Sequence, residues 1–307
     1  MWFYLALSGY ACLAVVSILD KFILSKERVA PIVFVFYSSV FLLPLAFIIP
    51  WLAPQPGLRE WALIFVGALA FVASLFLMYI TFERSEVSHT GPLIGALIPL
   101  FILVLSSVFL GEEVLMTQIL GIIILSAGTL LISIQKKQPH HDWRTSIKFG
   151  VASAATFSIF HVTAKALYTE FGFLHGFLFL WGFVGIIGFL LFFSRKVRLA
   201  IFPEQKFGQV IFGKIFHRSD DGHRLGLVAA DKILGVVGAV LVQYSISIGS
   251  VTKVNALGGF QFALLIILVG ALTRFWPRVF REHYQVGELK RELSAVFIIA
   301  VGIYFLI

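Results

Sequence analysis

The feature that most constrains the fold is a series of apolar stretches, each close to the length of a membrane-spanning helix. A helix needs about 20 apolar residues to cross a hydrocarbon core about 30 Å thick. Ten stretches meet or approach this length, and they cover residues 2–24, 31–51, 61–82, 90–110, 115–134, 147–168, 174–194, 227–248, 254–274 and 293–307. The sequence therefore predicts an all-α integral membrane protein with ten transmembrane helices.

The composition excludes an ordinary soluble protein. Of the 307 residues, 59% are hydrophobic and 13% are charged, and the mean hydropathy is +0.97. Soluble proteins carry about 25% charged residues, and their surface-to-volume ratio limits how much apolar surface they bury. The net charge of +8 is therefore interpreted as basic loops facing anionic lipid, and no nucleic-acid partner is expected.

The Lys and Arg residues are distributed very unequally between the two sides of this predicted topology. Most lie in the loops after the first, third, fifth, seventh and ninth helices, including the long loops 195–226 and 275–292, whereas the opposite loops offer Arg59 and Lys253. Because basic loops face the cytoplasm, both termini are predicted outside. We expect a multi-pass protein in the plasma (inner) membrane of a prokaryote, with its apolar N-terminus retained as the first helix.

The two halves of the chain share weak similarities in the same order. Lys21 aligns with Lys165, Tyr79 with Tyr244, and Gly128 with Gly302, and the offset grows only where the two long basic loops lie. Five helices in each half make the repeats inverted, which is a frequent transporter architecture with the substrate site between the repeats. The predicted domains are a first repeat (1–134), a basic linker (135–146) and a second, divergent repeat (147–307).

Residues 82–133 carry a distinctive order of motifs. They comprise the polar turn SEVSHTG, LIPLF with Pro99 in mid-helix, Ser106-Ser107, and LGEEVLMTQILGIIILSAGTLLI, in which Leu110-Gly111-Glu112 precede Gln118, Gly121 and Gly128. This pattern resembles the repeat unit of EamA-type transporters in the drug/metabolite transporter superfamily.

The resemblance implies inverted repeats around a central cavity, which move small metabolites by alternating access without a cofactor. The second half is a poorer match, because TRFWPRVFREHY replaces its counterpart of Leu-Gly-Glu. The family is also expected to have cytoplasmic termini, opposite to what the loop charges indicate.

Ionisable residues within spans are candidates for function, because charge is costly there. His161 lies near the middle of the sixth predicted helix, and Lys165 follows one turn later on the same face. Both are predicted substrate-binding residues. The alternatives are a hydrogen-bonded structural histidine and a lysine that reaches the interface, and the latter is favoured for Lys21 and Lys232.

Uncharged polar residues in the spans form a second candidate set. An unpaired amide in hydrocarbon costs several kcal/mol, so these side chains are expected to face the helix bundle. They either bind substrate or form interhelical hydrogen bonds. The predicted substrate-binding members are Tyr79, Gln243, Tyr244, Asn255 and Gln261. Pro99 is a predicted gating hinge, because it frees a backbone carbonyl of its helix.

Two further groups are interpreted as structural. Glu112 and Glu113 lie in a tight turn, where they are expected to cap the following helix. The Gly182, Gly185 and Gly188 series is interpreted as a site of close helix packing.

The leading functional prediction is a secondary transporter or facilitator of a small metabolite, not an enzyme. No nucleophile motif, phosphate-binding loop or metal-ligand spacing occurs, and the lone Cys12 excludes an internal disulfide. Alternatives are a flippase for lipid or polyprenyl-linked substrates and a lipid-modifying membrane enzyme. The acid and histidine cluster HRSDDGH (217–223) is the candidate site for the enzyme. The expected partners are a small-molecule substrate and membrane lipid, while a coupling ion and a homodimer stay open.

Overall fold

The described part of the chain is built from α-helices and short 3-10 helices joined by turns. The computed structural model describes residues 1–24, 31–84, 87–134, 143–201, 221–275 and 286–307, which form helices and turns without a strand. The elements are α1 (Trp2–Leu24), α2 (Pro31–Val40), α3 (Leu43–Ala46), η1 (Ile49–Trp51), α4 (Leu58–Arg84), α5 (Val87–Phe109), α6 (Met116–Ser133), α7 (Trp143–Leu190), η2 (Leu191–Phe193), α8 (Arg195–Ile201), α10 (Asp221–Ile248), α11 (Val251–Ala256), α12 (Gly258–Phe275) and α13 (Val286–Leu306). The all-α prediction is confirmed.

The membrane-crossing helices are fewer by length and composition than the ten predicted. Among the described residues, six helical segments are long and apolar enough to cross a membrane, or seven if α2 with α3 and η1 counts as one bent span. The ranges 227–248 and 293–307 are helical but do not meet the same criteria. The count of ten spans therefore stays a prediction.

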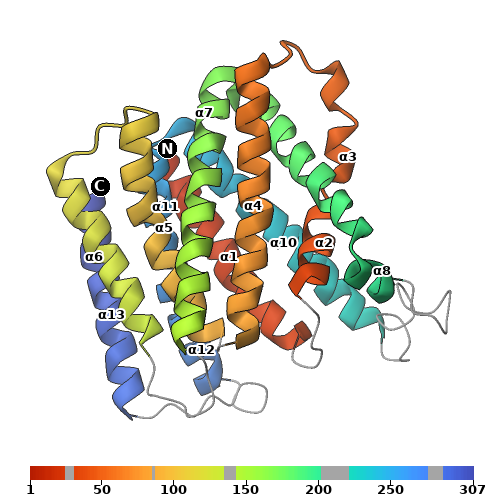
Figure 1. Ribbon diagram of the computed structural model, residues 1–307. Coiled ribbons are helices and arrows are strands. Elements are labelled where there is room, and N and C mark those ends of the chain that lie inside the picture. Colours follow the sequence, from red (N-terminus) through yellow and green to blue (C-terminus); the bar gives the residue numbers. More distant parts are fainter. Residues whose placement is uncertain (25–30, 85–86, 135–142, 202–220, 276–285) are drawn as a thin grey trace.

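The longest segment is a helix that reverses its direction. Residues 145–193 form 49 helical residues, well beyond the roughly 20 that one crossing requires. Gly172 interrupts α7 with a φ of +74°, a conformation that glycine adopts without a steric penalty. Figure 1 shows a first arm (residues 143–171) rising to this glycine and a second arm (residues 173–190) returning toward α8.

Two other predicted spans are broken. The range 31–51 is divided into α2 and a second part formed by α3 and η1 (Leu43–Trp51), and the two parts meet at an angle of 44°. Pro44 and Pro50 lie in the first turns of α3 and η1, where a proline starts a new helix. The range 254–274 is divided at Leu257 between α11 and α12. Both corrections place irregular backbone inside a predicted membrane segment.

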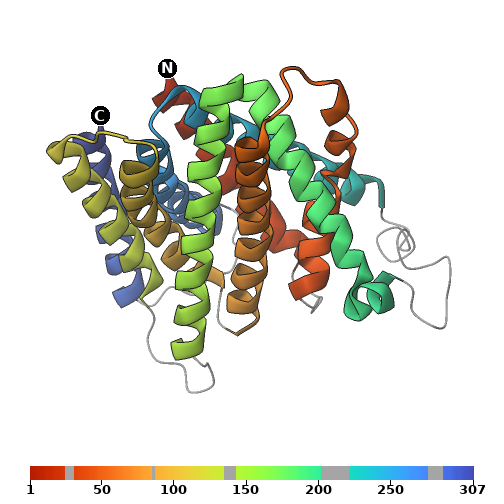
Figure 2. The ribbon, with the colours of Figure 1, turned by 45° about the horizontal axis from the view of Figure 1, so that its top comes forward.

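Helix pairing joins the two halves of the chain. The most extensive packing is between α4 and α7, between α6 and α13, and between α1 and α10. Figures 1 and 2 show α6 and α13 side by side at one edge of the molecule. Each of these three pairs combines an element before residue 135 with one after residue 142.

Small residues allow close approach at these contacts. A Cβ atom on Gly121 would lie 3.0 Å from the carbonyl oxygen of Gly302, and a Cβ on Gly9 would lie 2.9 Å from that of Gly238. On the second arm of α7, a Cβ on Gly185 would lie 2.4 Å from the backbone nitrogen of Leu43. The prediction that the glycines of this arm mark close packing is confirmed.

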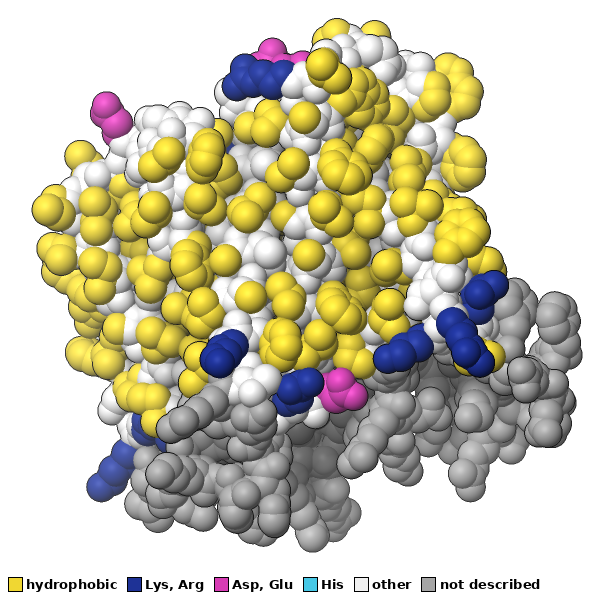
Figure 3. Space-filling model, viewed as in Figure 1, with side chains coloured by type: hydrophobic (Ala, Val, Ile, Leu, Met, Phe, Trp, Pro, Cys, Tyr) yellow, Lys and Arg dark blue, Asp and Glu magenta, His cyan; other side chains and the backbone are white. Residues whose placement is uncertain are grey.

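The outer surface suits a lipid environment. Large apolar side chains such as Phe41, Trp51, Phe297 and Tyr304 are mostly exposed. Figure 3 shows hydrophobic side chains over the middle of the molecule and Lys and Arg along its lower edge. Both termini lie at the opposite, upper end in Figures 1 and 2, which we call the terminal end.

Candidate functional site

The polar contacts between helices concentrate around a break between α10 and α11. Helix α10 ends at Ile248, and the side chain of Ser250 begins α11 by accepting a hydrogen bond from the backbone N–H of Lys253 (3.0 Å). The last carbonyl groups of α10 have no further turn of the same helix to bond with. Their partners must come from elsewhere in the structure.

Lys165 supplies those partners from the first arm of α7. Its ammonium nitrogen Nζ donates to the carbonyl oxygens of Ile246 (3.0 Å), Ser247 (3.0 Å) and Gly249 (2.8 Å). These bonds use all three donors of the ammonium group, at the negative end of the α10 dipole. Lys165 thus holds the end of α10 and does not merely reach an interface. Its predicted contact with substrate stays a prediction.

A second polar group joins the turn after α5 to α11. The Thr252 hydroxyl is fully buried and donates to Oε2 of Glu112 (2.7 Å), and it lies 2.8 Å from the hydroxyl of Ser106. Glu112 also interacts electrostatically with Lys165. This group therefore connects residues from both halves around the α10–α11 break.

This arrangement corrects the structural interpretation of Glu112. Helix α6 begins at Met116, has no acidic residue in its first turn, and uses Gln118 Oε1 to accept from the backbone N–H of Leu115 (3.3 Å). Glu112 lies outside this first turn and binds the second half instead. The prediction that Glu112 caps the following helix is wrong.

Two more contacts connect α7 with α10. The buried hydroxyl of Tyr168 donates to Oε1 of Gln243 (2.9 Å), and the ring of Phe173 lies edge-on to Tyr244 with centroids 5.0 Å apart. The structure therefore places Gln243 and Tyr244 against α7, in contact with Tyr168 and Phe173. Gln243 has the interhelical hydrogen bond that was weighed against substrate binding.

His161 lies on the same face of the first arm. His161, Lys165 and Tyr168 follow at spacings of four and three residues, and the last two bind α10, so this face is directed at α10. The ring of His161 lies 5.1 Å from that of Phe160, and its buried Nδ1 has no hydrogen-bond partner in the described part of the chain. A buried nitrogen without a partner is a candidate contact for a ligand.

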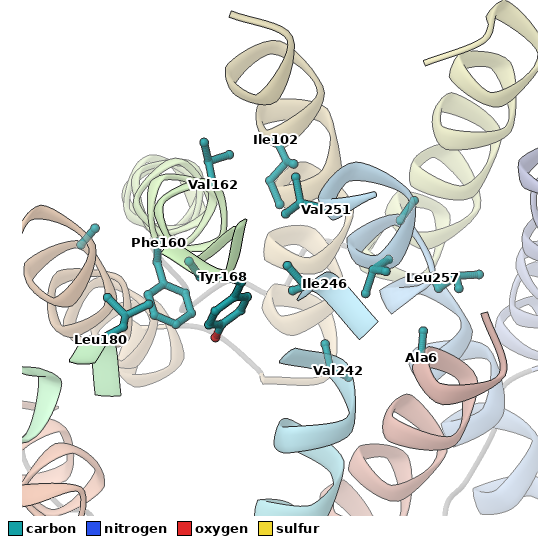
Figure 4. Close-up of a cluster of buried hydrophobic side chains, with 14 of the residues drawn as sticks. Ala6, Ile102, Phe160, Val162, Tyr168, Leu180, Val242, Ile246, Val251 and Leu257 are labelled. Carbon is teal, nitrogen blue, oxygen red and sulfur yellow. The ribbon is translucent and has the colours of Figure 1, made fainter. Parts of the chain in front are cut away.

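Aromatic rings from α4 and both arms of α7 pack beside this face. The ring of Phe71 lies 4.7 Å from Phe160 and 4.9 Å from Trp181, measured between centroids. Phe177 continues the series, 5.6 Å from Trp181 and 5.4 Å from Phe173. Figure 4 shows Phe160 beside Leu180 of the second arm, with Tyr168 on the side of α7 nearer to α10. The rings position the two arms of α7 against α4.

The other predicted substrate-binding residues lie apart from this group. Tyr79 packs on Phe34 of α2 with ring centroids 4.7 Å apart. Asn255 is buried and donates to the carbonyl of Val251 in its own helix (2.9 Å), and Gln261 lies 3.5 Å from the hydroxyl of Ser17 on α1. Their roles in substrate binding stay predictions.

The predicted hinge residue Pro99 lies inside a continuous helix. Helix α5 remains helical across Pro99 and also across Pro92. The hydroxyl of Ser158 on α7 donates to the neighbouring carbonyl of Ile98 (3.0 Å), which supplies an external partner close to the proline. Hinge motion at Pro99 stays a prediction.

Several predicted features fall outside what the structure describes. The linker 135–146 is described only from residue 143, the side chains of Lys21 and Lys232 are not described, and the HRSDDGH cluster lies beyond the described side chains. Within the described residues, no group of three or more His, Cys, Asp or Glu is placed to hold a metal ion.

Three residues of the site were missed by sequence reasoning. Ser106 was noted only as part of a family-like motif, while Thr252 and Tyr168 were not selected at all. Thr252 follows Gly249-Ser250, a helix-breaking pair that marks an α10–α11 interruption. The contacts of Ser106 and Tyr168 join residues far apart in the sequence, and no local pattern indicates them.

Comparison with known proteins assigns the first half of the chain. Residues 1–134 match the model of the EamA-like transporter family. A solved structure described only as "Crystal structure of protein" superposes with a TM-score of 0.59 at 16% identity, and the match covers 99% of this chain and 95% of that one. No curated protein matches the chain.

The structural match shows that the whole described chain adopts a fold already seen in another protein, while the family match carries the functional information. The apolar helices and this match together support a multi-pass membrane protein. The match of residues 1–134 to the EamA-like transporter family confirms the resemblance noted in residues 82–133, and this part of the chain is similar to that family of membrane transporters.

Proposed function

We propose that this protein is a secondary transporter that moves a small metabolite by alternating access between two inverted five-helix repeats. The observation that carries the proposal is that helices of each half pack against helices of the other half in a reciprocal pattern. The first helix of the first half, α1, packs on α10, and the first arm of α7, which opens the second half, packs on α4. An inverted repeat produces such reciprocal pairs around its axis.

Other pairs follow the same rule. Helices α6 and α13, the last of each half, pack on each other, as two elements at a twofold axis do. The packing of α1 on α12 has its counterpart in the packing of α7 on α5. This reciprocity supports two repeats of five helices, with α7 contributing one helix from each arm.

In the proposed mechanism, the contacts around the α10–α11 break close the terminal end of the transport path. The three bonds of Lys165, the Ser106–Thr252–Glu112 group and the Tyr168–Gln243 bond all join different elements there. Alternating access requires these contacts to break when the terminal end opens.

We assign substrate contact first to His161 and Tyr244, because His161 has an unpartnered buried nitrogen and Tyr244 lies on the facing helix. Gln243, Lys165, Tyr79, Asn255 and Gln261 remain further proposed contacts, and Pro99 the proposed hinge. Substrate discovery by thermal-shift screening of purified protein supplies the solute for transport measurements, since a bound ligand stabilises the native state.

A disulfide across the terminal end tests the mechanism. The hydroxyl oxygens of Ser106 and Thr252 lie 2.8 Å apart, so cysteines at both positions approach disulfide geometry. In a Cys12→Ala background, Ser106→Cys with Thr252→Cys should cross-link under mild oxidation and stop uptake of the screened solute into proteoliposomes. Reduction should restore uptake.

A matched control separates locking from oxidation damage. Ser107 is exposed and its hydroxyl bonds to the carbonyl of Leu103 in its own helix, so Ser107→Cys with Thr252→Cys should not cross-link, and its uptake should be the same before and after oxidation. Full transport by the cross-linked Ser106/Thr252 protein would contradict the proposal. Movement of a fluorescent lipid in the same vesicles would favour the flippase alternative.

A further inference from the structure

The end of α10 has the features of a binding position for a monovalent cation. The carbonyl oxygens of Ile246, Ser247 and Gly249 converge on one point, where each lies 2.8–3.0 Å from the Lys165 nitrogen. Three carbonyl oxygens at the negative end of a helix dipole attract positive charge. Backbone carbonyls at interrupted helices hold the coupling cation in several transporter folds.

The local backbone keeps these oxygens available. Helix α10 ends at Ile248, and the first backbone donors of α11 are taken by Ser250, through Lys253 N–H on its hydroxyl and Val254 N–H on its carbonyl. The backbone donors after the break are therefore bonded within their own segment. The last carbonyls of α10 are left to accept hydrogen bonds from a group on another element.

A negative charge also acts at this point. Glu112 is the charged residue that acts on Lys165, and its carboxylate accepts the Thr252 hydroxyl beside the break. Lys165 itself is half-buried, and His161 lies one turn before it on the same helix. Without the ammonium group, the three carbonyls would lose their shared donor and Glu112 would lose the cation that it acts on.

We propose that the end of α10 is a monovalent-cation site, and that the ammonium of Lys165 fills it, while the terminal end is closed, in place of a bound coupling ion. The position then recognises monovalent or primary-ammonium cations chiefly through backbone carbonyls. This inference rests on the proposed transport function, and it implies that transport needs no sodium at this site.

Chemical rescue of a truncated side chain tests the site without a substrate. Lys165→Ala removes the atoms that n-propylammonium would replace. The apparent melting temperature of this variant, purified in detergent, should fall below that of the wild type. Addition of n-propylammonium chloride should recover at least half of that fall, and sodium chloride should recover part of it, both measured against choline chloride at equal ionic strength.

Two variants on the same helix serve as controls. Lys165→Met keeps an apolar chain that blocks the position, so it should lose stability without cation rescue. Lys148→Ala removes an exposed lysine from the other end of the first arm, and it should neither lose stability nor respond to the choice of cation.

The wild type provides an independent arm if Lys165→Ala does not fold. Its melting temperature should be equal in sodium and choline chloride, since Lys165 already fills the site, and selective stabilisation by sodium would overturn the proposal. Equal rescue of the Ala and Met variants, or no rescue of Lys165→Ala, would also overturn it.

The transport proposal is judged separately. The melting measurements contain no substrate, so absence of transport in proteoliposomes would reject the proposed function and leave the cation result standing. Failure of the cation rescue in the melting measurements would reject the cation site while leaving the transporter assignment in place.

Discussion

Replacement of Gly185 by alanine tests how tightly the second arm of α7 packs against the broken segment that follows α2. A Cβ at this position would lie 2.4 Å from the backbone nitrogen of Leu43 and 2.6 Å from the carbonyl carbon of Leu42. Both neighbours are backbone atoms, so neither can rotate away as a side chain does. The arm or the segment must shift as a whole.

The size of the shift follows from the distances. Carbon atoms pack favourably at about 3.5–4.0 Å, so the two elements must separate by roughly 1 Å. Overpacking of this kind costs about 1–3 kcal/mol, more than the helix propensity of up to about 1 kcal/mol that alanine gains over glycine. The melting temperature should fall by roughly 2–12 °C for a chain of this size.

Gly270 provides the matched control for this substitution. It lies within α12, it is exposed, and a Cβ there would meet no atom within 4 Å. Thermal unfolding of both variants, followed by size-exclusion chromatography in the same detergent, should show a loss for Gly185→Ala and none for Gly270→Ala. Equal melting temperatures for the two variants would refute the packing argument.

Two further predictions concern individual contacts, and a third concerns the orientation of the chain in the membrane. Tyr168→Phe leaves the Gln243 oxygen buried without its partner, so stability should fall by about 1–3 kcal/mol in thermal or denaturant unfolding. Tyr244→Phe should change little, because the Tyr244 hydroxyl has no hydrogen bond to the described part of the chain. Glu112→Gln removes the charge beside Lys165 and should cost about 1–2 kcal/mol in the same assay, whereas the exposed Glu113→Gln should be neutral. A reporter active only in the cytoplasm, fused after Ile307, should stay silent, because the terminal end lies opposite the basic edge; a bright reporter would reverse the orientation.

The helical fold could be predicted because most of the helices correspond to a continuous apolar stretch of the sequence. The predicted range 2–24 coincides with α1, and the range 115–134 differs from α6 by one residue at each end. Apolar length alone is enough for such helices, since lipid requires every backbone group to be bonded within the segment. The same signal does not distinguish a straight helix from a broken one, so the interruptions near Pro44 and Leu257 were missed.

The candidate site was less predictable, because its bonds join distant parts of the chain. His161 and Lys165 were selected because an ionisable side chain is energetically costly inside a membrane. That argument does not require knowledge of what either side chain binds. What Lys165 binds depends on where α10 ends, and this depends on Gly249 and Ser250 more than 80 residues later. The role of Glu112 could not be predicted for the same reason. Its neighbours in the sequence do not distinguish a carboxylate in a surface turn from one that contacts the other half of the chain.

The contacts at the terminal end have a strength suited to the proposed gate. The three bonds of Lys165, the two of Thr252 and the Tyr168–Gln243 bond must be exchanged for bonds to water or to other protein groups when this end opens. At about 0.5–1.5 kcal/mol net for each bond, their loss costs about 3–9 kcal/mol.

A ligand shifts a two-state equilibrium from 1:99 to 99:1 with about 5.5 kcal/mol of differential affinity. That value lies within the range estimated for the closed end, so substrate binding has enough energy to open a gate of this kind. A purely apolar seal would offer no comparable exchange with water, because its opening would expose hydrocarbon without new hydrogen bonds. The hydrogen bonds around the α10–α11 break therefore allow this end to stay closed at rest and still open when a small solute binds.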